Sequence, residues 1–386
     1  TGGFYAANGS YTGNGATSSV TGLGFAPDLV IIKHNDQATD QYAVFRTKLM
    51  AGDRTAYFAN AVTVFAGGIA SLNGDGFSVG TSTTVNTSGD TYYWTAFGNA
   101  MKPDVSGGSS DFLIGQYIGT GRDNVNIRAL PISPDLVVVK VVAATAGAWR
   151  TSSQSGDNSL FFAATAQAAN IIQSLNSNGF QIGTATNAGT SGSTYDYFAF
   201  KAGSRFAVNT YTGNGTSQNI ASAGFRPDHL WVKKTTGGTA RGGVLRTSAQ
   251  SGDAAQPFLN AATQLNGITD LLSDGFSVGN GTSTNESTFT YQYAAWYGMT
   301  LEQSAYRFFA NQDSTQVGAA LAAQDTAANL NSAGAAFRLR LLMHAGNTTS
   351  TPAANSFKLQ YASTTSGGCT YSFYSSSAFI DVATST

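Results

Sequence analysis

Short apolar segments that alternate with polar residues recur along the chain, and turns that contain glycine separate them. Phe77 and Val79, for example, flank a serine directly after an Asp-Gly pair. Alternation with a period of two predicts β-strands with one buried face. Asp-Gly or Asn-Gly between apolar segments is typical of type I′ hairpin turns, which need positive φ at two successive residues. The pattern predicts β-structure throughout, and only residues 163–175 and 260–272 are compatible with short helices.

The same landmarks return three times in the same order, which indicates homologous repeats. Each segment has a tyrosine turn, a Pro-Asp pair before an apolar run that ends in lysine, an Arg-Thr pair, a Gly-Asp pair and an aromatic residue. In chain order these landmarks are Tyr11, Tyr117 and Tyr211; Pro27, Pro134 and Pro227; Arg46, Arg150 and Arg246; Asp53, Asp157 and Asp253; and Phe58, Phe162 and Phe258. We therefore divide the chain into repeat 1 (1–103), repeat 2 (104–204), repeat 3 (205–301) and an unrelated segment, 302–386.

The predicted fold class is all-β. Each repeat is expected to form an antiparallel two-sheet β-sandwich of about seven strands or more, with jelly-roll or Ig-like topology. Segment 302–386 also contains alternating apolar stretches, at 337–343 and 356–361, and is expected to form a fourth, distinct β-sandwich. The tandem arrangement thus predicts three homologous sandwiches followed by one of another kind.

One predicted strand in each repeat is apolar on both faces. In repeat 1 it contains Leu29, Val30, Ile31 and Ile32 in succession. A sheet with one face in water would alternate instead. We therefore expect the outer face to be covered by a short helix, a long loop, a neighbouring repeat or another subunit.

Charge is scarce in this sequence. The 386 residues include 20 Lys and Arg and 21 Asp and Glu, so that 11% are charged, where roughly 25% is average. Because 42% of the residues are hydrophobic, the chain is expected to fold and not to be disordered. A net charge of -1 argues against nucleic-acid binding through basic patches. No apolar run approaches the ~20 residues of a membrane-spanning helix, so no membrane insertion is predicted.

Covalent features are few. Cys369 is the single cysteine, so an intramolecular disulfide and a Cys-cluster zinc site are excluded. The sequence begins at Thr1 and not at methionine, which is expected of a chain that has lost a leader or is a piece of a longer product.

Besides the Pro-Asp pair and its lysine, one arginine–aspartate pair is retained in all three repeats. The pairs are Arg46 with Asp53, Arg150 with Asp157, and Arg246 with Asp253. They would form a ligand site or a structural element in which the arginine bridges to an aspartate or to loop carbonyls. Retention in three copies favours the structural role, since a single active site needs no copying.

The sequence predicts no catalytic residue and no cofactor. His34, His229 and His344 occupy non-equivalent positions, so a nucleophile–histidine–carboxylate triad is not expected. Most acidic residues recur in turns, where they bond to nearby backbone groups. The Gly-rich loops lack the Lys-Ser/Thr that ends a phosphate-binding loop.

Two kinds of binding site remain candidates. Oxygen ligands for calcium are offered by the pairs Asn73 and Asp75, Asn176 and Asn178, and Asn311 and Asp313, although hairpin turns explain the first two pairs without a metal. A platform on which sugars stack is offered by Trp94, Trp149, Trp231 and Trp296 together with many tyrosines, although alternation predicts the first and last of these tryptophans in the core.

The ordered motifs YTGNG, GFxPDLVxIK, RTS with SGD, DGFxVG and TYxYxAF resemble a tandem repeat family of phage tail and other virion proteins and of large secreted bacterial surface proteins. The segment 302–386 is similar to a β-sandwich module that accompanies such repeats in exported bacterial proteins. The resemblance implies an extracellular, cell-surface or virion-surface location, and it implies no catalytic residues.

The sequence as a whole therefore predicts a non-catalytic extracellular structural protein. It would be a subunit of a surface filament, surface layer or similar exported assembly, and its partners would be copies of itself, because a net charge near zero favours association. The alternative is an adhesin or a phage tail-fibre or virion protein whose loops bind a surface glycan or receptor. An enzyme is not predicted.

Overall fold

The computed structural model describes residues 3–35, 41–99, 111–235, 238–298, 300–312, 318–329, 336–346, 360–361 and 380–381. The chain divides into a larger unit, which contains Thr1–Gly298, and a C-terminal unit, to which the described residues from 300 onward belong. The larger unit thus contains all three repeats.

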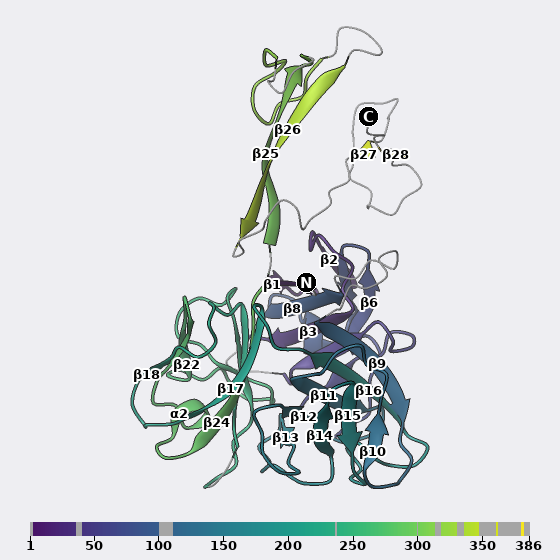
Figure 1. The fold of residues 1–386 in the computed structure, drawn as a ribbon, viewed down its shortest axis with the longest axis vertical. Coiled ribbons are helices and arrows are strands. Elements are labelled where there is room, and N and C mark those ends of the chain that lie inside the picture. Colours follow the sequence, from purple (N-terminus) through teal and green to yellow (C-terminus); the bar gives the residue numbers. More distant parts are fainter. Residues whose placement is uncertain are drawn as a thin grey trace. The chain divides into compact units, whose positions relative to one another are not determined.

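Repeat 1 consists of two antiparallel sheets (Figure 1). Its strands are β1 (Phe4–Thr12), β2 (Ser18–Thr21), β3 (Leu29–His34), β4 (Val44–Thr47), β5 (Ala56–Tyr57), β6 (Ile69–Asn73), β7 (Gly76–Val79) and β8 (Thr91–Asn99). The five-stranded sheet has the order β1-β8-β3-β4-β5, and the three-stranded sheet has the order β2-β7-β6.

Repeats 2 and 3 have the same topology, strand for strand. The strands of repeat 2 are β9 (Phe112–Ile118), β10 (Val125–Ile127), β11 (Leu136–Val141), β12 (Ala148–Thr151), β13 (Leu160–Phe161), β14 (Ile172–Asn176), β15 (Gly179–Ile182) and β16 (Thr194–Phe200). Those of repeat 3 are β17 (Phe206–Thr212), β18 (Gln218–Ile220), β19 (His229–Lys234), β20 (Val244–Thr247), β21 (Gln256–Pro257), β22 (Ile268–Leu272), β23 (Gly275–Val278) and β24 (Thr290–Trp296). The prediction of an all-β fold built from tandem antiparallel sandwiches is confirmed.

The Asp-Gly and Asn-Gly motifs form hairpins, but not by the predicted turn. In repeat 1, Asn73 pairs with Gly76, so that the central residues are Gly74 and Asp75, and neither has positive φ. The predicted type I′ turn is therefore wrong. Glycine is required for another reason: a Cβ on Gly76 would lie 2.0 Å from the carbonyl oxygen of Val20 in β2.

The short helices also lie elsewhere than predicted. Residues 163–175 and 260–272 contain irregular backbone and then strands, because the isoleucines that begin β14 and β22 are buried and pair with β15 and β23. The helical turns are α1 (Thr83–Asn86) and α2 (Thr282–Asn285). Among the described residues, no helix is long and apolar enough to cross a membrane.

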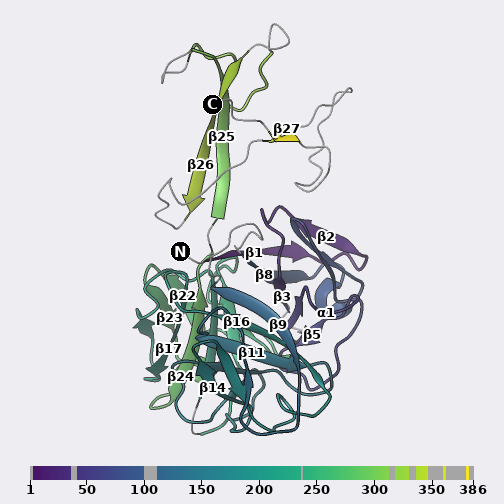
Figure 2. The ribbon, with the colours of Figure 1, turned by 45° about the vertical axis from the view of Figure 1, so that its right-hand side comes forward.

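The strand that is apolar on both faces separates two cores. Every residue of β3 is buried. Leu29 and Ile31 belong to a core that all three repeats share, while Val30 and Ile32 belong to the core of the repeat 1 sandwich. The same alternation occurs in β11, which pairs with β16 (Figure 2). The sequence allowed four kinds of cover for the outer face of this strand, and the structure shows that the neighbouring repeats cover it.

Three phenylalanines, one from each repeat, meet at the centre of the shared core. The ring centroids of Phe58 and Phe162 are 4.6 Å apart, those of Phe162 and Phe258 are 4.6 Å apart, and those of Phe58 and Phe258 are 5.2 Å apart. Each is at most 1% exposed. We call this cluster the phenylalanine triad.

The backbone around the triad is bonded in a cyclic pattern. The N–H of Ala43 in repeat 1 donates to the carbonyl of Phe258 in repeat 3, at 3.0 Å. Gly147 of repeat 2 donates to Phe58 of repeat 1, and Gly243 of repeat 3 donates to Phe162 of repeat 2, each at 2.9 Å. Each repeat is thus joined to both others in an approximately threefold arrangement.

In the C-terminal unit, the described strands are two antiparallel pairs. β25 (Thr300–Ala310) pairs with β26 (Phe337–Gly346), and β27 (Gln360–Tyr361) pairs with β28 (Ile380–Asp381). The strand expected at 337–343 is confirmed, whereas most of the stretch expected at 356–361 lies outside the described residues. The fourth β-sandwich stays a prediction.

Truncation of one member of the triad should destabilise the whole larger unit. Phe58→Ala leaves a cavity where three repeats meet, so we expect a loss of about 3–5 kcal/mol in the free energy of unfolding. Urea denaturation followed by tryptophan fluorescence measures this loss, since the tryptophans are distributed over all three repeats.

Ile118→Ala is the matched control, because Ile118 is 65% exposed and its truncation should change stability by no more than about 0.5 kcal/mol. Separate transitions for the three repeats, of which Phe58→Ala shifts only one, would contradict the shared core.

Candidate functional site

The repeated arginine–aspartate pairs lie inside the fold and bond to backbone groups. The guanidinium of Arg46, 6% exposed, donates to the carbonyl oxygens of Arg54 (2.9 Å) and Ile69 (3.2 Å) and to others in the intervening loop. The carboxylate of Asp53 accepts a hydrogen bond from the N–H of Gly67, at 2.8 Å. The two side chains thus stabilise the loop that follows β4, Arg46 by bonding to its carbonyls and Asp53 by linking it to Gly67.

Repeats 2 and 3 form the same kind of contacts. Arg150 donates to the carbonyls of Asn158 and Gly156, and Arg246 donates to those of Ala254, Ile268 and Gly252. Asp157 and Asp253 accept from the N–H groups of Asn170 and Asn266. The structure therefore brings each arginine and aspartate of a pair to one loop of its own repeat, and it does not bring the three pairs together.

The lysine that ends each apolar strand connects neighbouring repeats, a role that sequence reasoning missed. Lys140 donates to the carbonyl of Val62 in repeat 1 (3.3 Å), and Lys233 donates to that of Ala163 in repeat 2 (2.8 Å). Lys33 reaches Leu259 in repeat 3 in the same way, at 3.3 Å. Burial lowers the pKa of Lys140 and of Lys233 to about 8. The sequence did contain a signal for this role, since all three repeats retain a lysine at the end of the apolar run.

The side chains of the first predicted calcium pair, Asn73 and Asp75, form hydrogen bonds around their hairpin, and Asn176 of the second pair donates to Asn126 at 3.0 Å. The Asp75 carboxylate accepts hydrogen bonds from the N–H groups of Gly22 (3.0 Å) and Gly24 (2.5 Å), and the Asn73 amide donates to Ser78 at 3.0 Å. Asp313 lies outside the described residues. Within the described part of the chain, no group of three or more His, Cys, Asp or Glu side chains is placed to hold a metal ion.

The tryptophans form no exposed platform. Trp94 is 8% exposed and packs in the core of repeat 1, and the other three are 1% exposed and form part of the core that the repeats share. The hypothesis of a sugar-stacking surface made by tryptophan is therefore wrong, because Trp149 and Trp231 lie in strands in which every residue is buried.

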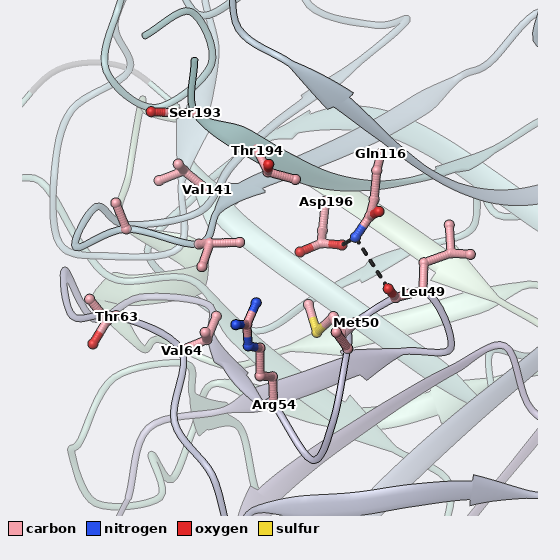
Figure 3. A pocket seen from close by; sticks show the side chains of 13 residues that line it. Leu49, Met50, Arg54, Thr63, Val64, Gln116, Val141, Ser193, Thr194 and Asp196 are labelled. Carbon is pink, nitrogen blue, oxygen red and sulfur yellow. Dashed lines mark hydrogen bonds between the residues drawn. The ribbon is translucent and has the colours of Figure 1, made fainter. Parts of the chain in front are cut away.

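A cleft lies where repeat 1 meets repeat 2 (Figure 3). It encloses about 680 Å³, within the range of about 300–1,000 Å³ that is typical of small-molecule sites. Repeat 1 supplies Leu49, Met50, Ala51, Arg54, Thr63 and Val64, and repeat 2 supplies Gln116, Val141, Val142, Ala143, Ser193, Thr194 and Asp196. Its walls thus combine charged, hydroxyl, amide and apolar groups.

A buried carboxylate forms the polar centre of the cleft. Asp196 in β16 is 3% exposed, and its Oδ1 accepts a hydrogen bond of 2.8 Å from Nε2 of Gln116 in the neighbouring β9. The same amide lies 3.3 Å from the carbonyl oxygen of Leu49, across the junction. The exposed guanidinium of Arg54 points toward Asp196 from repeat 1 (Figure 3).

Opposing effects act on this carboxylate. Burial raises the pKa of Asp196, while the hydrogen bond from Gln116 and the positive charges of Arg54 and Lys140 act to lower it. The net direction is upward, because desolvation is the largest of these effects. The carboxylate thus lies in a poorly solvated place, where two cations partly offset the cost of its burial.

The other two junctions lack this combination. The strand register that pairs Lys140 with Asp196 pairs the equivalent lysines with Tyr93 in repeat 1 and Gln292 in repeat 3. Arg54 lies eight residues after the repeated arginine, where the other repeats have Asn158 and Ala254, and the Gln116 position is Ser10 or Thr210. Sequence reasoning missed the cleft because it followed what the repeats share.

A family model described as a domain of unknown function, DUF7483, matches residues 1–171 and 201–304. The chain belongs to the DUF7483 family. The match includes Arg54 and Gln116, whereas Asp196 falls between the two matched segments. No curated protein has a sequence that matches this chain.

The histidines of this DUF7483 chain lie in different surroundings. Nε2 of His34 lies 3.0 Å from Oδ2 of Asp90, at the end of β3. His344 lies in β26, and its side chain is outside the described residues. His229 is 2% exposed and lies beside the shared core.

The bonding of His229 defines its neutral form. Nε1–H of Trp231 donates to Nε2 of His229 at 2.6 Å, so Nε2 carries no proton, and Nδ1 lies 3.0 Å from Oγ1 of Thr95 in repeat 1. Burial lowers the pKa of His229 from 6.5 to about 3. Protonation at Nε2 would place two donors face to face.

His229 should make the larger unit sensitive to acid. Between pH 6.5 and about 3 the unfolded state binds a proton at this residue and the folded state does not. Stability should therefore be complete above about pH 6.5 and should fall as the pH is lowered, by up to about 1.4 kcal/mol per pH unit. Denaturant titrations at a series of pH values measure this slope.

His229→Leu is the informative variant, because leucine stands at the equivalent positions of repeats 1 and 2, Leu29 and Leu136. Its free energy of unfolding should decline less steeply with acid than that of the parent protein. Equal slopes for both proteins would show that His229 takes up its proton without unfolding.

Proposed function

We propose that this DUF7483 chain is a non-catalytic structural protein of an extracellular or virion-surface assembly. In this proposal the three-repeat unit acts as one rigid block that contacts copies of itself, in a filament, a surface layer or a related array. The observation that supports it best is the shared core. The residues that all three repeats retain contribute to this packing or to hydrogen bonds with the backbone, which are structural roles.

The distribution of charge also supports the proposal. At least seven of the 20 basic side chains are buried inside the larger unit, namely Lys33, Arg46, Lys140, Arg150, Lys233, Lys234 and Arg246. Burial of these cations further lowers the number of charged side chains on the surface of a chain that already has few. Such a surface can pack against a neighbour without the cost of desolvating ions.

The proposed location follows the resemblance of the repeat motifs to those of secreted surface proteins and virion proteins. A binding role on such a surface, as an adhesin or tail-fibre protein, is the second candidate function. The cleft between repeats 1 and 2 favours it, since it presents two charged side chains, Arg54 and Asp196, whose equivalents at the other two junctions are uncharged.

The assembly proposal predicts association of the purified protein at high concentration. Negative-stain microscopy should show filaments or lattices, and sedimentation velocity should show species larger than the monomer. Because the contacts would involve few ions, raising the ionic strength from about 0.1 M to about 1 M should not dissociate them.

A protein that stays strictly monomeric at the highest soluble concentration would contradict self-assembly. Dissociation in high salt would instead show contacts made by charged side chains, contrary to the proposed uncharged surface.

A further inference from the structure

We propose that the cleft between repeats 1 and 2 binds a neutral saccharide, with Asp196 and Arg54 holding adjacent hydroxyl groups of one sugar. This inference extends the second candidate function to named residues and a ligand class. It is independent of self-assembly, since the cleft lies within one chain.

The first argument is the asymmetry of the three junctions. The three repeats have the same topology, and equivalent backbone hydrogen bonds and lysine contacts join each repeat to the next. The fold therefore does not need a carboxylate at the Asp196 position, because Tyr93 and Gln292 occupy it in the other repeats. A departure confined to one copy can serve a purpose that belongs to that copy alone.

The second argument is the unfinished bonding of the carboxylate. Oδ1 of Asp196 accepts from the neutral amide of Gln116. Lys140, opposite Asp196 in the sheet, directs its ammonium to backbone carbonyls, including those of Val62 and Ala143. Among the residues that the structure describes, none donates a hydrogen bond to Oδ2. Oδ2 is accessible from the cleft, which Asp196 lines, so a bound hydroxyl group can donate a hydrogen bond to it.

The third argument concerns the class of ligand. A carboxylate only accepts hydrogen bonds and a guanidinium only donates them, so that two adjacent hydroxyl groups can bond to both, one as donor and the other as acceptor. Opposite charges on the two side chains favour a neutral ligand over an anion or a cation. The hydroxyls of Thr63, Ser193 and Thr194 add further polar partners, and apolar side chains such as Leu49 and Val64 can contact the C–H groups of a sugar ring.

The test uses the full chain and two variants that copy another repeat. Arg54→Ala introduces alanine, which repeat 3 has at the equivalent position, Ala254. Asp196→Gln introduces glutamine, which repeat 3 has at Gln292. Both substitutions are therefore compatible with the fold. A glycan array with neutral, sialylated and amino-sugar glycans is the first probe, and calorimetric titration with the free saccharide of the strongest response is the second.

We expect a neutral glycan to bind the parent protein, and each variant to weaken its binding roughly tenfold or more, because each loses a hydrogen bond to a charged group. Asn158→Ala is the matched control. It changes the position equivalent to Arg54 at the junction of repeats 2 and 3 and should leave binding unchanged. Thermal melting of all variants checks that the fold is retained.

Several results would overturn the proposal: no binding of any neutral glycan, binding confined to charged glycans, or equal binding by the parent protein and both variants. An equal loss in Asn158→Ala would place the ligand elsewhere. Glycan binding by a protein that remains monomeric would support this site while contradicting self-assembly, so the two proposals can fail separately.

Discussion

The structure of the larger unit depends on burying the second apolar face of one strand in each repeat. A single sandwich covers one face of β3, β11 or β19 and leaves the other in contact with water. Three repeats solve this together, since each covers the exposed face of its neighbours around the phenylalanine triad. Hydrophobic burial of this kind is the dominant favourable contribution to folding. The arrangement of three repeats thus supplies the second cover that this strand needs.

Polar groups in the structure follow from that closure. Strand ends and loops of one repeat lie against those of the next, and their backbone groups need partners once water is excluded. The buried lysines supply donors across the junctions, while the arginines supply donors to the long loop inside each repeat. At least seven of the chain's 20 basic residues are therefore buried in the interior.

Much of the fold could be predicted from the sequence, because strand alternation and turn residues are local signals. Matched landmarks identified the repeats, and the run of apolar residues at Leu29 showed that a second cover was needed. The choice of cover could not be predicted, since it depends on contacts between residues about a hundred positions apart in sequence. The cleft was missed for a related reason: Arg54 and Asp196 lie in different repeats, and only a comparison of Asp196 with Tyr93 and Gln292 marks that position as unusual.

The covalent connection of the three repeats has a consequence for how such a protein can change. In a trimer of identical short chains, one substitution would alter all three junctions at once, and any cost to stability would be incurred three times. Here the cleft differs from its two counterparts while those retain neutral side chains. A single polypeptide with internal symmetry can keep two junctions for cohesion and leave the third open to variation.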